Sequence, residues 1–324
     1  MKSEKRYKEI IEPQNQLNLF GYENYFNAFI ELYEKKKLPN TILLSGEKGL
    51  GKSTFVYHFI NYVLSKNEKF NYSTNNFSIN EKNYSYKLLN KNTHPNFFLI
   101  ENRNLEKGIK IDQARNLLRF LNKSTYSRDL KLIMIDNAEY LNLNSSNALL
   151  KAIEEPRDNT FFFIICNDSS KILSTVKSRC TEFRFFFNTS QKKDIFQNLI
   201  EQYDNKFVID TILKKLYFVS PGNLLKYILP LYSANSEAQH NNLSCILYFI
   251  DKYKNEKKPE IISLISLFIE IFYNELTLSN SIYVNTYYLN NIKILKQIDD
   301  MKKFNLDEKN IFIWIKDILA NEAK

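Results

Sequence analysis

The sequence predicts an α/β domain built on a parallel sheet, followed by regions that are helical throughout. Two observations support this fold class. Short runs rich in β-branched and aromatic residues alternate with helical patterns over residues 1–185, and the strand signals fade after Phe187. The runs are also apolar on both faces, which is typical of strands in a sheet that helices cover on both sides.

Each predicted strand is a short apolar run, and the four are Thr41 to Ser45 (TILLS), Asn96 to Glu101 (NFFLIE), Leu130 to Asp136 (LKLIMID) and Thr160 to Asn167 (TFFFIICN). The helices predicted between them are 53–64, 111–121 and 145–155. Asn144 is placed to cap the last of these helices, and Pro156 is placed to end it.

The remaining segments suggest how the chain is divided. Ser65 to Asn92 is polar, rich in asparagine and without a clear period, which predicts a long surface excursion or a partly mobile insertion. After an α/β domain over 1–187, the chain predicts a small helical domain over 188–233 and a second helical domain over 234–324. In the last domain we expect amphipathic helices at 261–275 and 310–319, with a loop at the charged stretch Lys252 to Pro259.

Composition excludes several classes of protein. The chain has 324 residues and is 44% hydrophobic, which is enough for a sizeable core and for more than one domain. Its longest apolar runs, such as 261–269, fall short of the roughly 20 residues that cross a bilayer, and the first ten residues lack the apolar stretch of a signal peptide. These features favour a cytoplasmic protein with no membrane partner. The three cysteines form no CxxC pair, which predicts reduced thiols.

The net charge of +9 is unevenly spread along the chain. Residues before Glu237 carry 34 basic and 24 acidic groups, whereas the rest is nearly balanced. Such an excess suits an acidic partner such as nucleic acid or a nucleotide phosphate, although a solvated basic surface is a comparable interpretation.

The stretch LSGEKGLGKST, from Leu44 to Thr54, carries the pattern G-x-x-x-x-G-K-S between a predicted strand and a predicted helix. In that context the backbone N–H groups of the loop would hold phosphate oxygens at the positive end of the helix. Lys52 would lie along the β and γ phosphates, and Ser53 would offer its hydroxyl to Mg²⁺. The sequence therefore predicts a site for ATP or ADP with Mg²⁺.

The strand that ends at Asp136 supplies a carboxylate for Mg²⁺ through water. In hydrolysing proteins of this architecture the next residue is a glutamate that polarises the attacking water, but here it is Asn137. An amide can orient water but cannot accept its proton, so hydrolysis should be impaired even if Asn137 reflects simple drift in an asparagine-rich chain. Glu139 follows two positions later, and this offset is expected to point it elsewhere.

Several motifs go beyond a generic phosphate loop. They are IKIDQARNLL at 109–118, NALLKAIEEP at 147–156, the strand ending in Asn167, and Ser178-Arg179-Cys180. Together they closely resemble the clamp-loader branch of the AAA+ ATPases over residues 17–230, and beyond that range the resemblance rests on helical character and length. It implies an AAA+ P-loop domain over 1–187, a helical lid over 188–233 and a helical collar that holds subunits together over 234–324.

The resemblance implies a catalytic role for Arg179, which would be presented to the ATP site of a neighbouring subunit. A guanidinium has a fixed fork of donors that can stabilise charge on a transferring phosphoryl group, whereas the alternative is an ordinary salt-bridging arginine. Asn167 resembles the sensor-1 residue that reads the γ-phosphate region, with a strand-end turn as the alternative. The predicted cofactor-binding residues are therefore Gly46, Gly49, Gly51, Lys52, Ser53, Thr54, Asp136 and Asn167, with Ser53 and Asp136 also serving Mg²⁺.

The chain also departs from the family pattern. Gly222, in Ser220-Pro221-Gly222-Asn223, stands where an arginine would reach the nucleotide from the lid, and neither it nor Asn223 carries a charge. An ordinary turn before a helix is the alternative for Gly222. Relatives often hold zinc after the P-loop helix, but 65–92 contains no cysteine, so we expect no zinc site.

These features predict a clamp-loader subunit of a bacterial replicative polymerase that binds ATP or ADP, hydrolyses it poorly, and donates Arg179 to a neighbour. Its expected partners are the motor and clamp-opening subunits of a hetero-oligomeric ring, the sliding clamp, and primer-template DNA contacted through its backbone. The alternative is a catalytically active AAA+ ATPase, either a motor subunit of the same complex or an independent enzyme. A P-loop kinase would need an acceptor pocket and a mobile lid, which the sequence does not indicate.

Overall fold

The computed structural model describes residues 10–102, 108–122, 130–167, 171–203, 219–232, 242–257, 259–279 and 281–322. These residues form two compact units, Glu9–Leu224 and Leu225–Lys324. The division does not test the boundaries predicted at 187 and 233, which stay predictions, and residues 204–218 of the predicted lid lie outside the described residues.

A five-stranded parallel sheet forms the centre of the first unit, in the order β2-β3-β4-β1-β5. Its strands are β1 (Thr41–Ser45), β2 (Phe97–Ile100), β3 (Lys131–Ile135), β4 (Thr160–Cys166) and β5 (Thr181–Arg184). The first four match the predicted runs to within a residue at either end. The sequence analysis missed β5 because this edge strand is largely exposed and lacks an apolar run.

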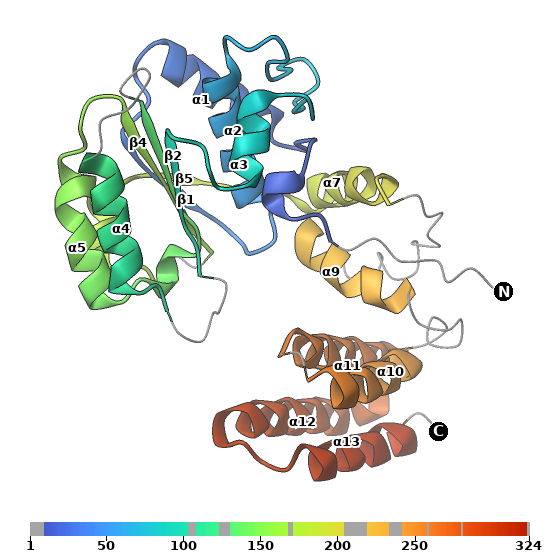
Figure 1. The fold of residues 1–324 in the computed structure, drawn as a ribbon. Coiled ribbons are helices and arrows are strands. Elements are labelled where there is room, and N and C mark those ends of the chain that lie inside the picture. The colour runs from blue at the N-terminus through green and yellow to red at the C-terminus, as the bar shows by residue number, and fades with distance from the viewer. Residues whose placement is uncertain are drawn as a thin grey trace. The chain divides into compact units, whose positions relative to one another are not determined.

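Helices cover both faces of the sheet (Figure 1). One face carries α1 (Glu23–Glu34), α2 (Lys52–Ser65) and α3 (Tyr84–Asn90), and the other carries α4 (Ile111–Asn122) and α5 (Leu143–Glu154). Strand side chains alternate between the two cores: Ile42 and Leu44 lie in the cluster on the α1–α2 side, whereas Leu43 lies in the cluster on the α4–α5 side. The prediction of a two-sided parallel sheet is therefore confirmed.

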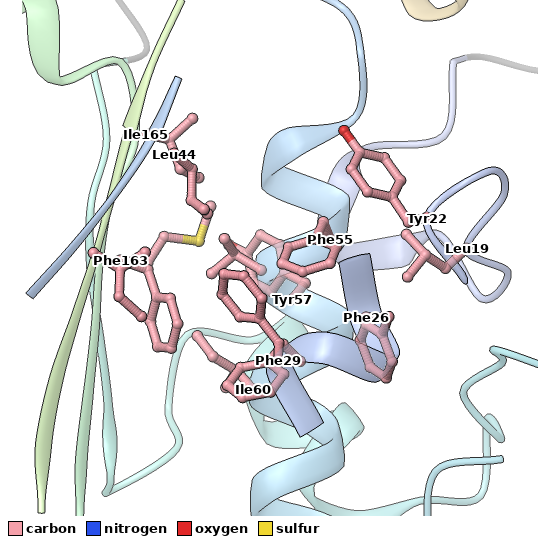
Figure 2. Close-up of a cluster of buried hydrophobic side chains, with 14 of the residues drawn as sticks. Leu19, Tyr22, Phe26, Phe29, Leu44, Phe55, Tyr57, Ile60, Phe163 and Ile165 are labelled. Atoms are coloured by element: carbon pink, nitrogen blue, oxygen red, sulfur yellow. The ribbon is translucent and has the colours of Figure 1, made fainter. Parts of the chain in front are cut away.

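The core on the α1–α2 side is rich in aromatic rings (Figure 2). Phe29 of α1 is 1% exposed, and its ring makes edge-on contacts with Phe55, Phe59 and Phe183 at centroid distances of 5.1, 5.5 and 4.9 Å. Rings in this geometry add to the free energy of apolar burial. The cluster ties α1 and α2 to the sheet directly behind the predicted phosphate loop.

The segment 65–92 packs against this unit through buried side chains, and the prediction of a surface excursion or a partly mobile insertion stays a prediction. Tyr72 and Ile79 are buried, and Asn83 caps α3 by accepting a hydrogen bond from the Tyr86 backbone N–H at 2.7 Å. His58 of α2 is also buried and contacts the Tyr72 hydroxyl and the Gln16 carbonyl, both at 3.0 Å. Buried asparagine and tyrosine side chains hold the segment in place. Such contacts cannot be recognised from its polar composition.

The predicted cap of α5 is also wrong. Asn142, not Asn144, is the N-cap, because its side chain accepts a hydrogen bond from the Ser145 backbone N–H at 2.8 Å. The helix therefore begins two residues earlier than predicted, and it ends at Glu154, two residues before Pro156. The shorter elements of this unit are η1 (Pro13–Asn15), η2 (Ala138–Tyr140), α6 (Ser174–Lys177) and α7 (Thr189–Glu201).

Beyond this unit the described residues are helical, as predicted. The helices are α10 (Asn242–Glu256), α11 (Pro259–Ser279), α12 (Val284–Phe304) and α13 (Glu308–Glu322), with η4 at Ser281–Tyr283, and α9 (Pro221–Tyr232) spans the boundary between the units. The prediction of a loop over Lys252 to Pro259 is wrong for most of its length, because α10 continues to Glu256 and α11 begins at Pro259.

Helix α11 is the core helix of the second unit, where it packs against both α10 and α12. Residues Ile261–Ser279 are long and apolar enough to span a membrane by length and composition, with a mean hydropathy of 1.6, but half of this stretch is buried inside the unit. Residues such as Ile265, Phe268 and Ile269 are at most 2% exposed. Burial of this kind accounts for the apolar composition by packing within the protein.

Replacing Phe29 by alanine should lower the free energy of unfolding of the first unit by about 3–5 kcal/mol, because the substitution removes a buried ring and leaves a cavity. Chemical denaturation monitored by circular dichroism measures the change. Phe186→Ala is the matched control, because Phe186 is 70% exposed and should cost little. Equal losses for the two variants would contradict the role assigned to the aromatic cluster.

Candidate nucleotide-binding site

The strand register brings the predicted site residues to one edge of the sheet. Ser45 of β1 pairs with Cys166 of β4, so Gly46 and Asn167 leave neighbouring strands side by side. Ile135 of β3 pairs with Ile164 of β4, which places Asp136 at the same edge. Because all these strands are parallel, their carboxyl ends meet where α2 begins at Lys52. This is where ligands bind in open α/β sheets.

The loop between β1 and α2 has a backbone that requires glycine. Gly49 and Gly51 have φ angles of +87° and +91°, which side-chain-bearing residues rarely adopt. A Cβ on Gly46 would lie 2.6 Å from the Phe185 backbone oxygen, so any residue with a side chain would clash at position 46. The loop also rests on the aromatic core, since the buried Tyr22 hydroxyl donates to the Leu50 carbonyl at 3.1 Å.

Lys52 is buried at the centre of the loop and is 3% exposed. Its Nζ donates to the carbonyl oxygens of Gly46 and Glu47, both at 2.8 Å, and to Asn167 Oδ1 at 3.0 Å. An ammonium has three N–H donors, and these three acceptors match that number. Lys52 therefore ties the loop to the end of β4, with its charge held where a phosphate would lie.

Burial lowers the pKa of Lys52 to about 8, although the nearby carboxylates of Asp136 and Glu139 oppose the shift. Burial likewise raises the pKa of Asp136, against the hydrogen bonds from Ser53 and the Asn137 backbone and against the charge of Lys52. Desolvation therefore dominates for both groups. An anionic phosphate beside Lys52 would favour its charged form.

Ser53 and Asp136 lie together as predicted. Ser53 Oγ donates to Asp136 Oδ2 at 2.9 Å, and Asp136 Oδ1 accepts from the Asn137 backbone N–H at 2.8 Å. Mg²⁺ prefers oxygen ligands of this kind, usually one or two protein groups together with phosphate and water. The donor set thus fits an Mg²⁺–nucleotide complex. Thr54 lies half-buried in the first turn of α2.

Asn167 is the hub of a polar network at this edge. Its Nδ2 donates to Asn137 Oδ1 at 2.7 Å and to Glu139 Oε1 at 2.9 Å, while its Oδ1 accepts from Lys52. The prediction that Glu139 points elsewhere is therefore wrong. Asn137 has φ +56° and begins the 3₁₀ turn Ala138–Tyr140, which returns Glu139 to the end of β4. Sequence spacing alone assumed an extended strand and missed this turn.

Residues 220–223 contact the outer side of the phosphate loop within the same unit. Ser220 Oγ and Asn223 Nδ2 donate to the Lys48 carbonyl at 2.6 and 3.0 Å, and the Gly222 N–H donates to the Gly49 carbonyl at 2.9 Å. A Cβ on Gly222 would lie 2.7 Å from that Gly49 oxygen. Gly222 therefore serves close packing, and no side chain at this position could extend from this backbone without a shift.

Arg179 lies at the opposite edge of the sheet from the phosphate loop. Thr181 of β5 pairs with Ile42 near the start of β1, whereas the loop begins at Gly46, about 13 Å further along the strand. The neighbouring Cys180 thiol donates to the Val176 carbonyl at 3.1 Å, and burial raises its pKa to about 12, so it is a neutral anchor. The Arg179 guanidinium remains partly exposed and pairs with Glu154 at 3.0 Å.

No cluster of three or more histidine, cysteine, aspartate or glutamate side chains arranged to hold a metal ion occurs among the described residues. Within the described part of the chain, Cys166, Cys180 and Cys245 form no disulfide.

A parallel sheet in the order β2-β3-β4-β1-β5, with a glycine-rich loop after β1 and an acid after β3, defines a P-loop nucleotide-binding fold of the AAA+ class. A sequence model of the family "DNA polymerase III, delta subunit" matches residues 21–188. DNA polymerase III subunit delta' of Buchnera aphidicola is 30% identical over 290 residues, which covers 79% of this chain and 85% of that protein.

Two further relatives extend the comparison. The delta' subunit of Pseudomonas aeruginosa is 32% identical over 140 residues, which covers 43% of this chain and 41% of that protein. A replication factor C small subunit of Methanococcus vannielii is 25% identical and covers 82% of this chain and 77% of that protein. Among solved structures, a DNA polymerase III gamma subunit-related protein of Thermotoga maritima aligns with a TM-score of 0.49 and 17% identity, over 91% of this chain and 100% of that chain.

The chain therefore belongs to the family of DNA polymerase III delta' subunits, which are clamp-loader subunits. The family resemblance drawn from the motifs at 109–118, 147–156 and 178–180 is confirmed. Sequence reasoning missed the contacts of Glu139 and of Ser220 with the site. The only sequence signals for these contacts are weak: an acidic residue, Glu139, three positions after Asp136, and a serine, Ser220, directly before Pro221.

The pKa of Lys52 gives a pH dependence for nucleotide binding. The protonated fraction of a group with a pKa of about 8 falls roughly tenfold between pH 7 and pH 9, and only the ammonium attracts phosphate. Affinity for ATP, measured by titration with a fluorescent analogue, should therefore weaken by up to about tenfold over this range. Lys52→Ala should bind more weakly and lose this dependence; an unchanged pH profile in that variant would contradict the assignment.

Proposed function

We propose that this clamp-loader subunit binds ATP or ADP with Mg²⁺ at the loop 46–54, hydrolyses it poorly, and donates Arg179 to the ATP site of a neighbouring subunit. The observation that carries the first part is the network around Asn167. Lys52, Ser53 and Asp136 have the chemistry to hold phosphate and Mg²⁺, while the residue after Asp136 is an amide hydrogen-bonded to Asn167. An amide in that position cannot accept a proton from the attacking water.

The contacts from residues 220–223 support a static site. In place of a charged side chain reaching from the lid, Ser220, Gly222 and Asn223 bond to the carbonyls of Lys48 and Gly49. These residues therefore hold the loop without adding positive charge for the γ-phosphate, so that the nucleotide would contribute to the structure of the subunit rather than to its own turnover.

The second part rests on the position of Arg179. The guanidinium lies at the edge of the sheet remote from the chain's own phosphate loop, so any phosphoryl group that it stabilises must belong to another molecule. Its partial exposure leaves it accessible to a neighbour. A trans arginine stabilises the charge that spreads over the transferring phosphoryl group.

The partners that we propose are the other clamp-loader subunits in a hetero-oligomeric ring, the sliding clamp, and primer-template DNA contacted through its phosphates, in the cytoplasm. The collar proposed for 234–324 has a surface suited to a neighbouring subunit. Exposed apolar side chains lie close in sequence from the end of α11 into α12, and no charged residue occurs from 276 to 292: Leu278, Ile282, Tyr283, Tyr288 and Leu289. Depletion of charge and exposed aromatic residues are typical of interface cores.

One observation favours a second candidate, a subunit that does hydrolyse ATP. The Glu139 carboxylate lies 2.9 Å from Asn167 Nδ2, beside the Lys52 ammonium, where it could take a proton from water in place of the missing glutamate. Glu139→Gln would then abolish turnover while keeping the hydrogen bond from Asn167.

Nucleotide content and turnover of the isolated chain separate the two candidates. We expect the chain to bind ATP, and Lys52→Ala to weaken binding by about 10- to 100-fold through loss of charge-assisted hydrogen bonds. ATP hydrolysis by the wild-type chain should stay at the level of that variant, which serves as the background control. Turnover above this level, stimulated by DNA and clamp and lost in Glu139→Gln, would establish the second candidate instead.

Arg179→Ala tests the donated arginine in the reconstituted complex. Loss of a trans arginine slows hydrolysis at the ATP site that it serves by roughly 10³-fold or more. The ATPase rate of the complex should therefore fall by nearly all of the part that the neighbouring site contributes. Nucleotide binding by this chain should be unchanged. The matched control is Arg115→Ala, which also removes an exposed, ion-paired arginine and should leave the rate unaltered. A complex with Arg179→Ala that hydrolyses ATP at the wild-type rate would sink the proposal.

A further inference from the structure

Within its own chain, the Arg179 guanidinium uses only some of its N–H groups as hydrogen-bond donors. Nε donates to Glu154 Oε2 at 3.0 Å, and Nη1 donates to the Thr175 carbonyl at 2.9 Å. Among the described residues, none accepts a hydrogen bond from Nη2. A guanidinium carries five N–H donors, so the two on Nη2 remain for a ligand outside the chain.

Glu154 is held in a defined place by the sheet. It is the last residue of α5, and the preceding Ile153 is buried with its carbonyl accepting a hydrogen bond from Thr41 Oγ1 at 3.0 Å. Thr41 begins β1, the strand that pairs with β5 just beyond Arg179. Both ends of the ion pair are therefore fixed to the same edge of one rigid sheet.

The backbone on the Arg179 side is fixed as well. The Arg179 N–H donates to the Val176 carbonyl at 3.1 Å, and the Cys180 thiol donates to the same oxygen. The flexible part is the side chain itself, which has several rotatable bonds and loses conformational entropy when it is held. A partner for Nε removes much of this freedom before any phosphate arrives, and preorganised donors stabilise a transition state better than mobile ones.

The form of the ion pair matters for this role. Arginine and a carboxylate often pair through two parallel hydrogen bonds, which would occupy Nη2 together with Nε. Here Glu154 takes Nε alone, so the pair orients the guanidinium without consuming the donors of Nη2. The Glu154 side chain is 55% exposed, so solvent screens its charge and leaves most of the positive potential of Arg179 in place.

We propose that Glu154 is a positioning residue for Arg179: together with the Thr175 carbonyl it holds the guanidinium so that Nη2 is available to the phosphates of a nucleoside triphosphate on a neighbouring subunit. The inference rests on the proposed donation of Arg179. It assigns the positioning of that arginine to Glu154, at the end of the helix that carries NALLKAIEEP.

A double-mutant cycle in the reconstituted complex tests this role. E154A should lower kcat of ATP hydrolysis by about two- to fivefold with little change in KM, the range expected for loss of an exposed ion pair. E154Q should keep most of the rate, because its amide oxygen can still accept from Nε. In an R179A background, E154A should change the rate no further, since its effect passes through Arg179.

E155A is the matched control, because the adjacent Glu155 is exposed and its removal changes the net charge equally; it should leave the rate unaltered. Thermal unfolding of each variant shows whether the fold is preserved. If E154A lowers the rate equally with and without Arg179, or does not lower it at all, the positioning role is overturned. If R179A itself leaves the rate unchanged, the proposal that Arg179 is donated to a neighbouring site is wrong, and this inference is overturned along with it.

Discussion

The register of β1 with its two neighbours is the constraint on which both candidate sites depend. Pairing of Ser45 with Cys166 places Gly46 beside Asn167 at the carboxyl edge, and pairing of Ile42 with Thr181 places Arg179 at the amino edge. A slip of one residue would reverse every side chain between the two cores, and burial of all five β1 residues on both faces opposes it. The distance between phosphate loop and arginine is therefore built into the sheet.

This separation places two unlike candidate sites at two edges of the sheet. At one edge, Lys52 joins the loop to Asn167, and Ser53 joins it to Asp136, which forms the candidate phosphate-binding arrangement. At the other, Glu154 and Thr175 hold a guanidinium that cannot serve that arrangement.

Much of the fold could be predicted because its signals are local. The strands 41–45 and 160–166 are continuous apolar runs, and the pattern from Gly46 to Ser53 encodes its own turn and helix start. Prediction from the sequence failed where contacts between residues far apart in the chain decide the structure. Exposed β5 forms because it pairs with β1, and the polar segment 65–92 packs against the first unit through buried Tyr72, Ile79 and Asn83. Glu139 reaches Asn167 through a left-handed residue that spacing could not reveal.

The sequence by itself determined the class of the protein and the residues of its phosphate loop, because glycine, lysine and serine at fixed spacing act through the local backbone. It also determined that the residue after Asp136 is an amide, Asn137, and not a glutamate. Only the tertiary structure decided where Glu139 lies, why position 222 must be glycine, and how Arg179 is held. Each of these depends on atoms brought together from segments far apart in the chain, and their distances exist only once the sheet has formed.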